Sequence, residues 1–193
     1  MKEADRKLNY LRDVIKTDER DMVRLEIVNA KEAPLSKEDV RSIVEIESHL
    51  KVQEWVYEYV DADSYKELRE YQEFFRKLPA NRRAEILIAK YDGCTVGFLG
   101  LWRRGVYMEH VASIGISVHP EYWGRGIATA LFKAAIELAR RKGLRRLEAE
   151  TLSANTAMRH TVEKVGFTLE CLRKNRVLKA GSYHDEAVYF LLL

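Results

Sequence analysis

The stretch VHPEYWGRGIATAL, residues 118–131, constrains the fold more than any other part of the chain. The apolar run that ends at Val118 is typical of a strand, and the residues after Gly126 keep the spacing of an unbroken helix. Gly124 and Gly126 can adopt backbone conformations that other residues avoid, and they lack the Cβ atoms that keep a ligand away from the main chain. The pattern predicts a strand that passes into a helix through a tight turn.

The start of the predicted helix is a potential anion site. The first four N–H groups of a helix lack an internal partner, and the aligned peptide dipoles leave a partial positive charge beside them. Residues 124–129 could therefore hold a phosphate or pyrophosphate, although an ordinary strand-to-helix turn is the alternative interpretation. Thr129 stands where a dinucleotide-binding loop has its third glycine, and the Gly-Lys-Ser/Thr of a P-loop does not follow, so neither of these two sites is predicted.

The same turn resembles the acyl-CoA loop of the GNAT family of N-acetyltransferases, whose pattern is Arg/Gln-x-x-Gly-x-Gly/Ala. Gly126 and Ala128 occupy the last two defined positions, whereas Trp123 replaces the usual Arg or Gln at the first. The sequence Tyr-Trp-Gly-Arg-Gly-Ile-Ala, residues 122–128, is similar to sequences in the branch of the family that contains ribosomal-protein N-terminal acetyltransferases.

Two later stretches agree with this resemblance. Asn155 begins a block, followed by Glu-Lys-Val-Gly-Phe at 163–167, that is similar to the Asn-x-x-Ser and Glu-Lys-x-Gly-Phe block of the family. Residues 181–189 resemble the closing hairpin of the same branch. Asn155 also suits the N-cap of a helix and Gly166 its C-terminal stop, so capping and ligand contact could coexist at Asn155. The resemblance covers residues 84–193.

The resemblance implies both a fold and an activity. The expected fold is α+β, with a mixed, mostly antiparallel sheet flanked by helices in a single domain at 21–193, preceded by an N-terminal helical extension at 1–20. The expected activity is transfer of an acetyl group from acetyl-CoA to a primary amine by direct attack in a ternary complex. The acceptor is expected to be a protein N-terminus or a small-molecule amine.

The resemblance also implies which residues contact acetyl-CoA. Backbone groups near the end of the strand at 111–118 would pair with the pantetheine arm, and the glycine turn would hold the pyrophosphate. The predicted contact residues are Ile116, Val118, Trp123, Gly124, Arg125, Gly126, Ile127, Ala128, Thr129 and Asn155.

The proton donor expected for the leaving thiolate is missing from its usual places. Many relatives have a Tyr shortly before the Lys-x-Gly-Phe block, but Val162 occupies that position, and Met158 stands for the Ser of Asn-x-x-Ser. Tyr183, Ser153 or water are the candidate substitutes, and Tyr183 is the predicted catalytic side chain among them.

The general base is predicted from acidic or imidazole side chains near the strand that leads to the loop. Glu109 and His110 lie just before this strand, although a plain surface turn is the alternative interpretation for each of them. Glu150 is a third and weaker candidate. Amine deprotonation requires such a group within hydrogen-bond reach, directly or through one water.

Two other functions compete with acetyl transfer. The missing acids suggest a non-catalytic acyl-CoA-binding sensor on the same fold. A nucleotide-binding module of another class would need an acidic ribose-binding residue after a βαβ unit, which is not found in this sequence.

Composition narrows the partners and the location. The 193 residues carry a net charge of +3 with 33% charged residues, and this near balance argues against nucleic acid as a partner. The longest apolar runs, such as 188–193, are too short to cross a bilayer, and the first residues lack a signal-peptide pattern, so a cytoplasmic protein without a membrane partner is expected. A homodimer contact is a further expectation, with the N-terminal helix as one candidate surface.

Cysteine and histidine patterns predict neither a disulfide framework nor a metal site. Cys94 and Cys171 are far apart and lack metal-ligand spacing, so each is expected to be a small buried apolar residue. The five histidines form no HxxxH or HxH pair, and no metal cofactor is expected.

The remaining periodicity predicts alternating strands and helices. Strands are expected at 24–30, 86–90, 95–102, 111–118, 145–151, 167–177 and 185–192, and helices at 36–50, 64–78, 125–141 and 156–165. The segment 52–63 and the helix after it are rich in aromatic residues: Trp55, Tyr57, Tyr59, Tyr65, Tyr71, Phe74 and Phe75. Most of these rings are expected to pack in the core and the rest to line an acceptor pocket.

Overall fold

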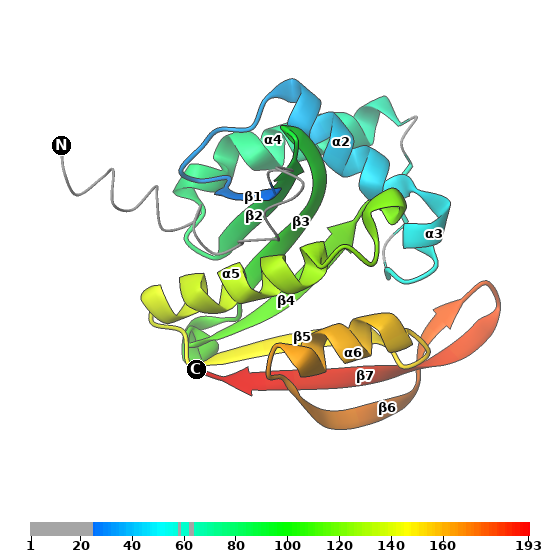
Figure 1. Ribbon diagram of the computed structural model, residues 1–193. Helices are drawn as coiled ribbons and strands as arrows, with labels where there is room; N and C mark the ends of the chain where they lie inside the picture. The colour runs from blue at the N-terminus through cyan, green and yellow to red at the C-terminus, as the bar shows by residue number, and fades with distance from the viewer. Residues whose placement is uncertain (1–24, 58, 62–63) are drawn as a thin grey trace, which may run out of the picture.

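The computed structural model describes residues 25–57, 59–61 and 64–193, and one twisted sheet organises them (Figure 1). Its strand order is β1-β2-β3-β4-β5-β7-β6. The strands are β1 (Leu25–Asn29), β2 (Ala84–Tyr91), β3 (Cys94–Arg103), β4 (Val111–Val118), β5 (Arg146–Leu152), β6 (Thr168–Lys179) and β7 (Ser182–Leu192). Within the described residues β4 and β5 form the one parallel pair. The predicted α+β fold with a mixed, mostly antiparallel sheet is confirmed.

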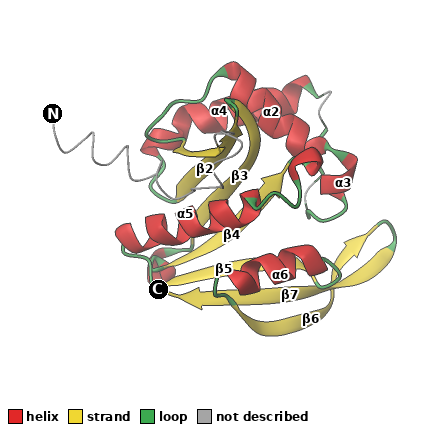
Figure 2. Cartoon of the chain, viewed as in Figure 1, coloured by secondary structure: helices red, strands yellow, loops and turns green. Residues whose placement is uncertain are grey.

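Helices cover both faces of the sheet (Figure 2). The α-helices are α2 (Lys37–Ser48), α3 (Leu50–Gln53), α4 (Tyr65–Lys77), α5 (Ile127–Arg141) and α6 (Thr156–Lys164), and the 3-10 turns are η1 (Leu78–Ala80), η2 (Val106–Met108) and η3 (Pro120–Tyr122). Helices α5 and α6 pack on one side, here called the first face, and α2 and α4 pack on the opposite side, the second face. Each face has its own apolar core.

Alternation along the strands separates the two cores. Even-numbered residues of β4, such as Ala112 and Ile114, join α5 and α6 in the larger core on the first face. Odd-numbered residues of the same strand point to the second face, where Gly115 is exposed to solvent. Helices α2 and α4 lie over β2 and β3, with Ile43, Ile86 and Ile88 in the smaller core. On the second face, β5, β6 and β7 therefore lie beyond the helices.

Helix α2 begins with a capping box, which Ser36 and the acidic residue three positions later indicate in the sequence. The Ser36 hydroxyl accepts a hydrogen bond from the Asp39 N–H at 3.0 Å, and the Asp39 carboxylate accepts one from the Ser36 N–H at 3.0 Å. The same carboxylate pairs with Lys90 of β2 at 2.8 Å and accepts the hydroxyl hydrogen bond of Thr95 of β3 at 2.7 Å. One side chain thus caps the helix and fixes it to two strands.

Several predicted boundaries move by a few residues. Helix α5 begins at Ile127 instead of 125, because Gly126 has φ of 78° and ends the turn in the left-handed region. A four-residue helix, α3, follows α2 where the sequence predicts none, and β7 begins at Ser182 instead of 185. The predicted N-terminal helix at 1–20 lies outside the described residues.

The expectation that both cysteines are buried is wrong. Cys94 is exposed at the turn between β2 and β3, and Cys171 is exposed on β6. Strand β6 lies at the end of the strand order, so its outward side chains face solvent and not a core.

Candidate active site

Strands β4 and β5 separate halfway along their length. Their parallel ladder joins Val111 to Arg146 and ends at the pair Ile114 and Ala149, although β4 continues to Val118. The opening between residues 115–118 of β4 and 150–152 of β5 is called the fork. Strand β4 remains paired with β3 along the fork, and none of the other strands in the described part of the chain pairs with the opposite edge of β4 there.

The backbone of β4 shows which groups face the fork. The Arg104 N–H donates to the Val111 carbonyl at 3.1 Å and the His119 N–H donates to the Val96 carbonyl at 2.8 Å, so odd-numbered residues face β3. Because the direction alternates along a strand, Ile116 and Val118 point their N–H and C=O groups into the fork. The indole Nε1 of Trp123 donates to the Val118 carbonyl at 2.7 Å. The sequence-predicted pantetheine contacts therefore lie at an open strand edge.

The glycine turn lies directly after this edge. Gly124 and Gly126 have φ of 75° and 78°, in the left-handed region that favours glycine, and an added Cβ would meet nothing within 4 Å at either position. Gly126 is the N-cap of α5, so no cap side chain accepts from the first N–H groups of this helix. A 15-residue helix whose first turn is uncapped and open has the geometry of a phosphate site.

Two predicted ligand residues have identifiable structural partners. The Arg125 guanidinium lies over the rings of Tyr91 and Tyr122, 5.7 and 5.1 Å from their centroids, and this stacking holds it beside the turn. The Asn155 side-chain oxygen accepts the Met158 N–H at 3.1 Å and caps α6. Its expected ligand contact stays a prediction beside this capping role.

Charged side chains surround the fork on the second face. Glu150 is the first residue of β5 beyond the last pair with β4, and its carboxylate is about one third exposed. One Arg173 nitrogen binds Glu150 at 3.0 Å and the buried Glu186 of β7 at 2.9 Å. Arg176 lies 3.8 Å from Glu186. Two carboxylates from neighbouring strands are thus held together by one guanidinium.

The segment between α3 and α4 closes over this cluster. Burial raises the pKa of Tyr57 and a hydrogen bond to Glu186 raises it further, so the hydroxyl remains protonated at neutral pH. The Lys179 ammonium donates to the Val56 carbonyl at 2.8 Å and also to the Gln53 carbonyl, which joins the β6–β7 hairpin to the same segment (Figure 2). Burial lowers the pKa of Lys179. Sequence patterns gave no signal for these contacts, because the partners are separated by more than 100 residues.

The catalytic residues predicted from the sequence lie at different places. Glu109 and His110 are exposed before β4, and six residues of strand, about 20 Å, separate His110 from Ile116. Tyr183 is 67% exposed near the tip of the β6–β7 hairpin. Val162, at the usual acid position, is buried in the first-face core. Glu150, the third candidate base, is the residue that the structure places directly beyond the last β4–β5 pair, at the fork.

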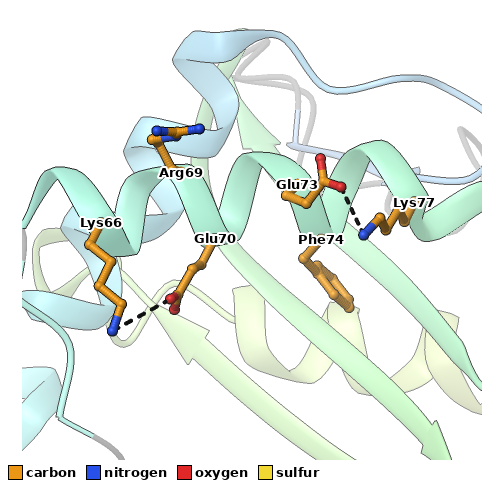
Figure 3. Close-up of a pocket in the computed structure, with 6 residues that line it drawn as sticks. All are labelled: Lys66, Arg69, Glu70, Glu73, Phe74 and Lys77. Atoms are coloured by element: carbon orange, nitrogen blue, oxygen red, sulfur yellow. Dashed lines mark ion pairs between the residues drawn. The ribbon is translucent and has the colours of Figure 1, made fainter.

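Two depressions adjoin α4. The larger, about 630 Å³, lies over a charged surface where Lys66 pairs with Glu70 at 3.8 Å and Lys77 with Glu73 at 2.8 Å (Figure 3). Such pairs one helical turn apart are typical of a solvated helix face. Phe74, which Figure 3 shows pointing from α4 toward the strands, lines the larger depression and also the second one, of about 320 Å³.

The described part of the chain contains neither a metal-ligand cluster nor a membrane-spanning helix. Among these residues no group of three or more His, Cys, Asp or Glu side chains is placed to hold a metal ion. None of the described helices has the length and apolar character needed to cross a membrane.

Comparison with known proteins places this geometry in a family. The chain matches the acetyltransferase (GNAT) family over residues 48–167. It is 31% identical over 120 residues to a candidate ribosomal protein bS18-alanine N-acetyltransferase of Bacillus subtilis, covering 62% of this chain and 77% of that protein. It is 33% identical over 102 residues to the L-amino acid N-acetyltransferase AaaT of Escherichia coli, covering 51% of this chain and 62% of that one.

Solved structures share the fold. A phosphinothricin acetyltransferase of Sinorhizobium meliloti in complex with acetyl-CoA superimposes with a TM-score of 0.73 at 23% identity, covering 88% of each chain. The acetyltransferase ACIAD1637 of Acinetobacter baylyi superimposes with a TM-score of 0.76 at 19% identity, covering 90% of this chain and 94% of that one. Both the sequence match over most of the chain and the shared architecture lead to one assignment: the chain belongs to the acetyltransferase (GNAT) family.

Proposed function

We propose that this protein transfers an acetyl group from acetyl-CoA to a primary amine at the fork. The observation that carries the proposal is the open β4 edge, which runs directly into the uncapped N-terminus of α5. A linear amide-containing arm pairs naturally with a free strand edge, and a pyrophosphate with a helix start. Members of the matched family named above are acetyltransferases.

The donor would lie along three parts of the site. The N–H groups of residues 126–129 and the neighbouring Gly124 would hold the pyrophosphate, with Arg125 beside them. Ile116 and Val118 would pair with the pantetheine amides. The thioester would then lie where the fork closes, near Ile114 and Ala149, because the strands meet there.

The acceptor would approach from the second face. Helices α5 and α6 fill the first face, whereas Gly115 and Glu150 are accessible from the second. Glu150 would take a proton from the ammonium, directly or through water, and the amine nitrogen would attack the thioester carbon. The carbon–sulfur bond then breaks, the CoA thiolate leaves, and the extra proton of the attacking nitrogen passes through water to the thiolate, which gives the amide and free CoA. Backbone N–H groups at the fork would stabilise the oxyanion formed during the attack.

Several more detailed predictions from the sequence remain proposals. These are Glu109 and His110 as bases, Tyr183 as an acid, a cytoplasmic location, a homodimer, and the division into an extension at 1–20 and one domain at 21–193. An acceptor of the protein N-terminus class is supported by similarity to the Bacillus subtilis relative, and a small-molecule amine by similarity to the Escherichia coli one.

Calorimetric binding of acetyl-CoA tests the donor site. The wild-type chain should bind acetyl-CoA. Gly126→Asp should weaken binding at least tenfold, because the added carboxylate would occupy the phosphate site at the helix N-terminus and repel the phosphate charge. Gly93→Asp is the matched control, because Gly93 also has positive φ, 82°, and open space around it, but lies in the β2–β3 turn. Undiminished binding by Gly126→Asp would refute the loop assignment.

Release of free CoA with a panel of primary amines separates an enzyme from a sensor. Acetyl transfer predicts a thiol product whose amount rises with amine concentration. Tight acetyl-CoA binding without thiol release from any amine would instead support the non-catalytic sensor.

A further inference from the structure

An aromatic cavity of about 320 Å³ lies between α2, α4 and strands β2 and β3. Most of its wall is made of rings: Tyr71, Phe74 and Phe75 from α4, and Phe98 and Trp102 from β3. The Phe74 and Trp102 rings lie 5.6 Å apart in a tilted arrangement. Trp102 remains 40% exposed, so a large apolar surface faces solvent inside the cavity. A concave apolar surface of this kind is typical of a small-ligand site.

A row of glycines connects this cavity to the fork. Gly100 of β3 is paired with Gly115 of β4, and Gly115 and Glu150 are the first residues of β4 and β5 beyond the last pair of these two strands, Ile114 and Ala149. An added Cβ would lie 2.7 Å from Trp102 Nε1 at Gly100 and 3.8 Å from it at Gly115, so the indole leans over this row. Trp102 is paired with Ser113 of β4, which is paired with Glu148 of β5, and because paired strands lie about 4.8 Å apart, the Trp102 backbone lies about 10 Å from the strand that carries Glu150.

The acidic side chains that line the cavity are paired with other side chains, so the aromatic rings form the main surface that a ligand could contact. Both carboxylates of its wall have partners: Glu47 accepts a hydrogen bond from the Tyr71 hydroxyl, and Glu70 pairs with Lys66. The second face of β3 carries Phe98, Gly100 and Trp102, and that of β4 carries Ser113, Gly115 and Ser117. A ligand group that crosses between Gly115 and Gly100 would therefore meet the Trp102 ring, which leans over these two glycines.

We infer that this cavity binds the side chain of the acceptor, and that the acceptor is an amine carrying a large apolar side chain. The inference rests on the proposed acetyl transfer at Glu150. With the reactive amine at the fork, a side chain of the length of Leu, Met or Phe crosses β4 and reaches Trp102, whereas that of Ala or Ser does not. Burial of apolar surface against the rings then selects the larger acceptor.

Rates of CoA release with a matched series of amino-acid amides test this selection. Glycinamide, alaninamide, leucinamide, methioninamide and phenylalaninamide share one reacting group and differ in side chain. The cavity predicts kcat/KM values at least tenfold higher for the three large acceptors than for alaninamide. Free amino acids and short peptides with the same first residue then distinguish a small-molecule source from a protein N-terminus.

Substitutions in the wall test where the selection arises. Trp102→Ala should reduce the preference for leucinamide over alaninamide at least tenfold, mainly through KM, with acetyl-CoA affinity unchanged. Gly115→Val, which narrows the crossing between Trp102 and Glu150, should reduce the same preference without removing a core ring. Tyr107→Ala is the control, since Tyr107 is 97% exposed outside the cavity, and it should leave the preference unchanged.

The outcomes separate this inference from the proposed function. Equal rates for alaninamide and leucinamide, a preference for spermidine, or an unchanged preference in both wall variants would overturn the cavity assignment while leaving acetyl transfer intact. Absence of acetyl-CoA binding by the wild-type chain would instead refute the proposed function, and the acceptor cavity with it.

Discussion

At the scale of single residues, the charge cluster on the second face decides how the fork can work. Glu186 is buried, and a buried carboxylate needs partners, which Arg173 and Tyr57 supply. The same Arg173 nitrogen also holds Glu150. Glu150 is therefore oriented at the fork by a network that it shares with two neighbouring strands, which favours it as the residue that accepts the amine proton.

Replacement of Glu150 tests this role. Glu150→Gln keeps the side-chain shape and removes the proton acceptor, so kcat should fall by a factor of about 10² to 10⁴ while acetyl-CoA affinity is retained. Steady-state CoA release and calorimetry measure the two quantities. Glu148→Gln is the matched control, because Glu148 lies on the same face of β5 and is also bound by arginines, Arg104 and Arg146. An equal loss of kcat in both variants would argue against a specific role for Glu150.

At the scale of elements, the Asp39 carboxylate fixes helix α2 to strands β2 and β3. Burial raises the pKa of Asp39, but hydrogen bonds from Lys90, Thr95 and Ser36 outweigh this effect and lower the pKa to about 2. Helix α2, which forms part of the aromatic cavity, is thus joined to β2 and β3 by the Asp39 carboxylate, whose side chain is 12% exposed. This contact positions Ile43 and Glu47 against the sheet.

The pH dependence of folding stability measures this contact. A carboxyl whose pKa is 3.8 when unpaired and about 2 when folded contributes about 2 kcal/mol at neutral pH. This stability is present above pH 4 and is lost as the pH falls from 4 toward 2. Asp39→Asn should lower the free energy of unfolding in urea by about 2 kcal/mol at pH 7 and by progressively less below pH 4.

The neighbouring acid of the same helix turn provides the comparison. Glu38 is exposed in the first turn of α2, so Glu38→Gln should change the unfolding free energy by less than about 0.5 kcal/mol at pH 7. If both variants are destabilised equally, the effect comes from helix charge and not from the Lys90 and Thr95 contacts.

At the scale of the whole molecule, the fork connects two faces with different roles. The first face carries the glycine turn and the two helices that cover β4 and β5. The second face carries Glu150 and the charge cluster on β5, β6 and β7, and the aromatic cavity between α2, α4, β2 and β3. A donor and an acceptor could therefore enter from opposite sides and meet at the fork.

Hydrogen exchange of the β4 amides tests this arrangement in the intact protein. Without acetyl-CoA, the Ile116 and Val118 amides should exchange rapidly, because they face the fork, whereas the Ser117 amide faces β3 and should exchange slowly. Saturating acetyl-CoA should slow Ile116 and Val118 at least tenfold toward the rate of Ser117. Rapid exchange of both amides in the bound protein would contradict pairing of the pantetheine arm with β4.

The sequence predicted what depends on short stretches. Gly124 and Gly126 do have positive φ, Ser36 and Asn155 do cap helices, and the strands and helices lie within a few residues of their expected places, because each follows from neighbouring residues. The resemblance of residues 84–193 also indicated the family, which the comparisons confirm.

Only the tertiary structure decided which distant side chains share the site. Glu150 gains its position from the separation of β4 and β5, its partner Arg173 comes from β6, and the Trp102 wall depends on the pairing of Gly100 with Gly115. No local sequence pattern predicts these neighbours, because strand pairing joins residues that are far apart in the chain. The register of that pairing also decides which side chains lie next to one another on each face of the sheet. The sequence by itself determined the glycine turn and the fold class, and the packing of the sheet determined which side chains lie at the fork.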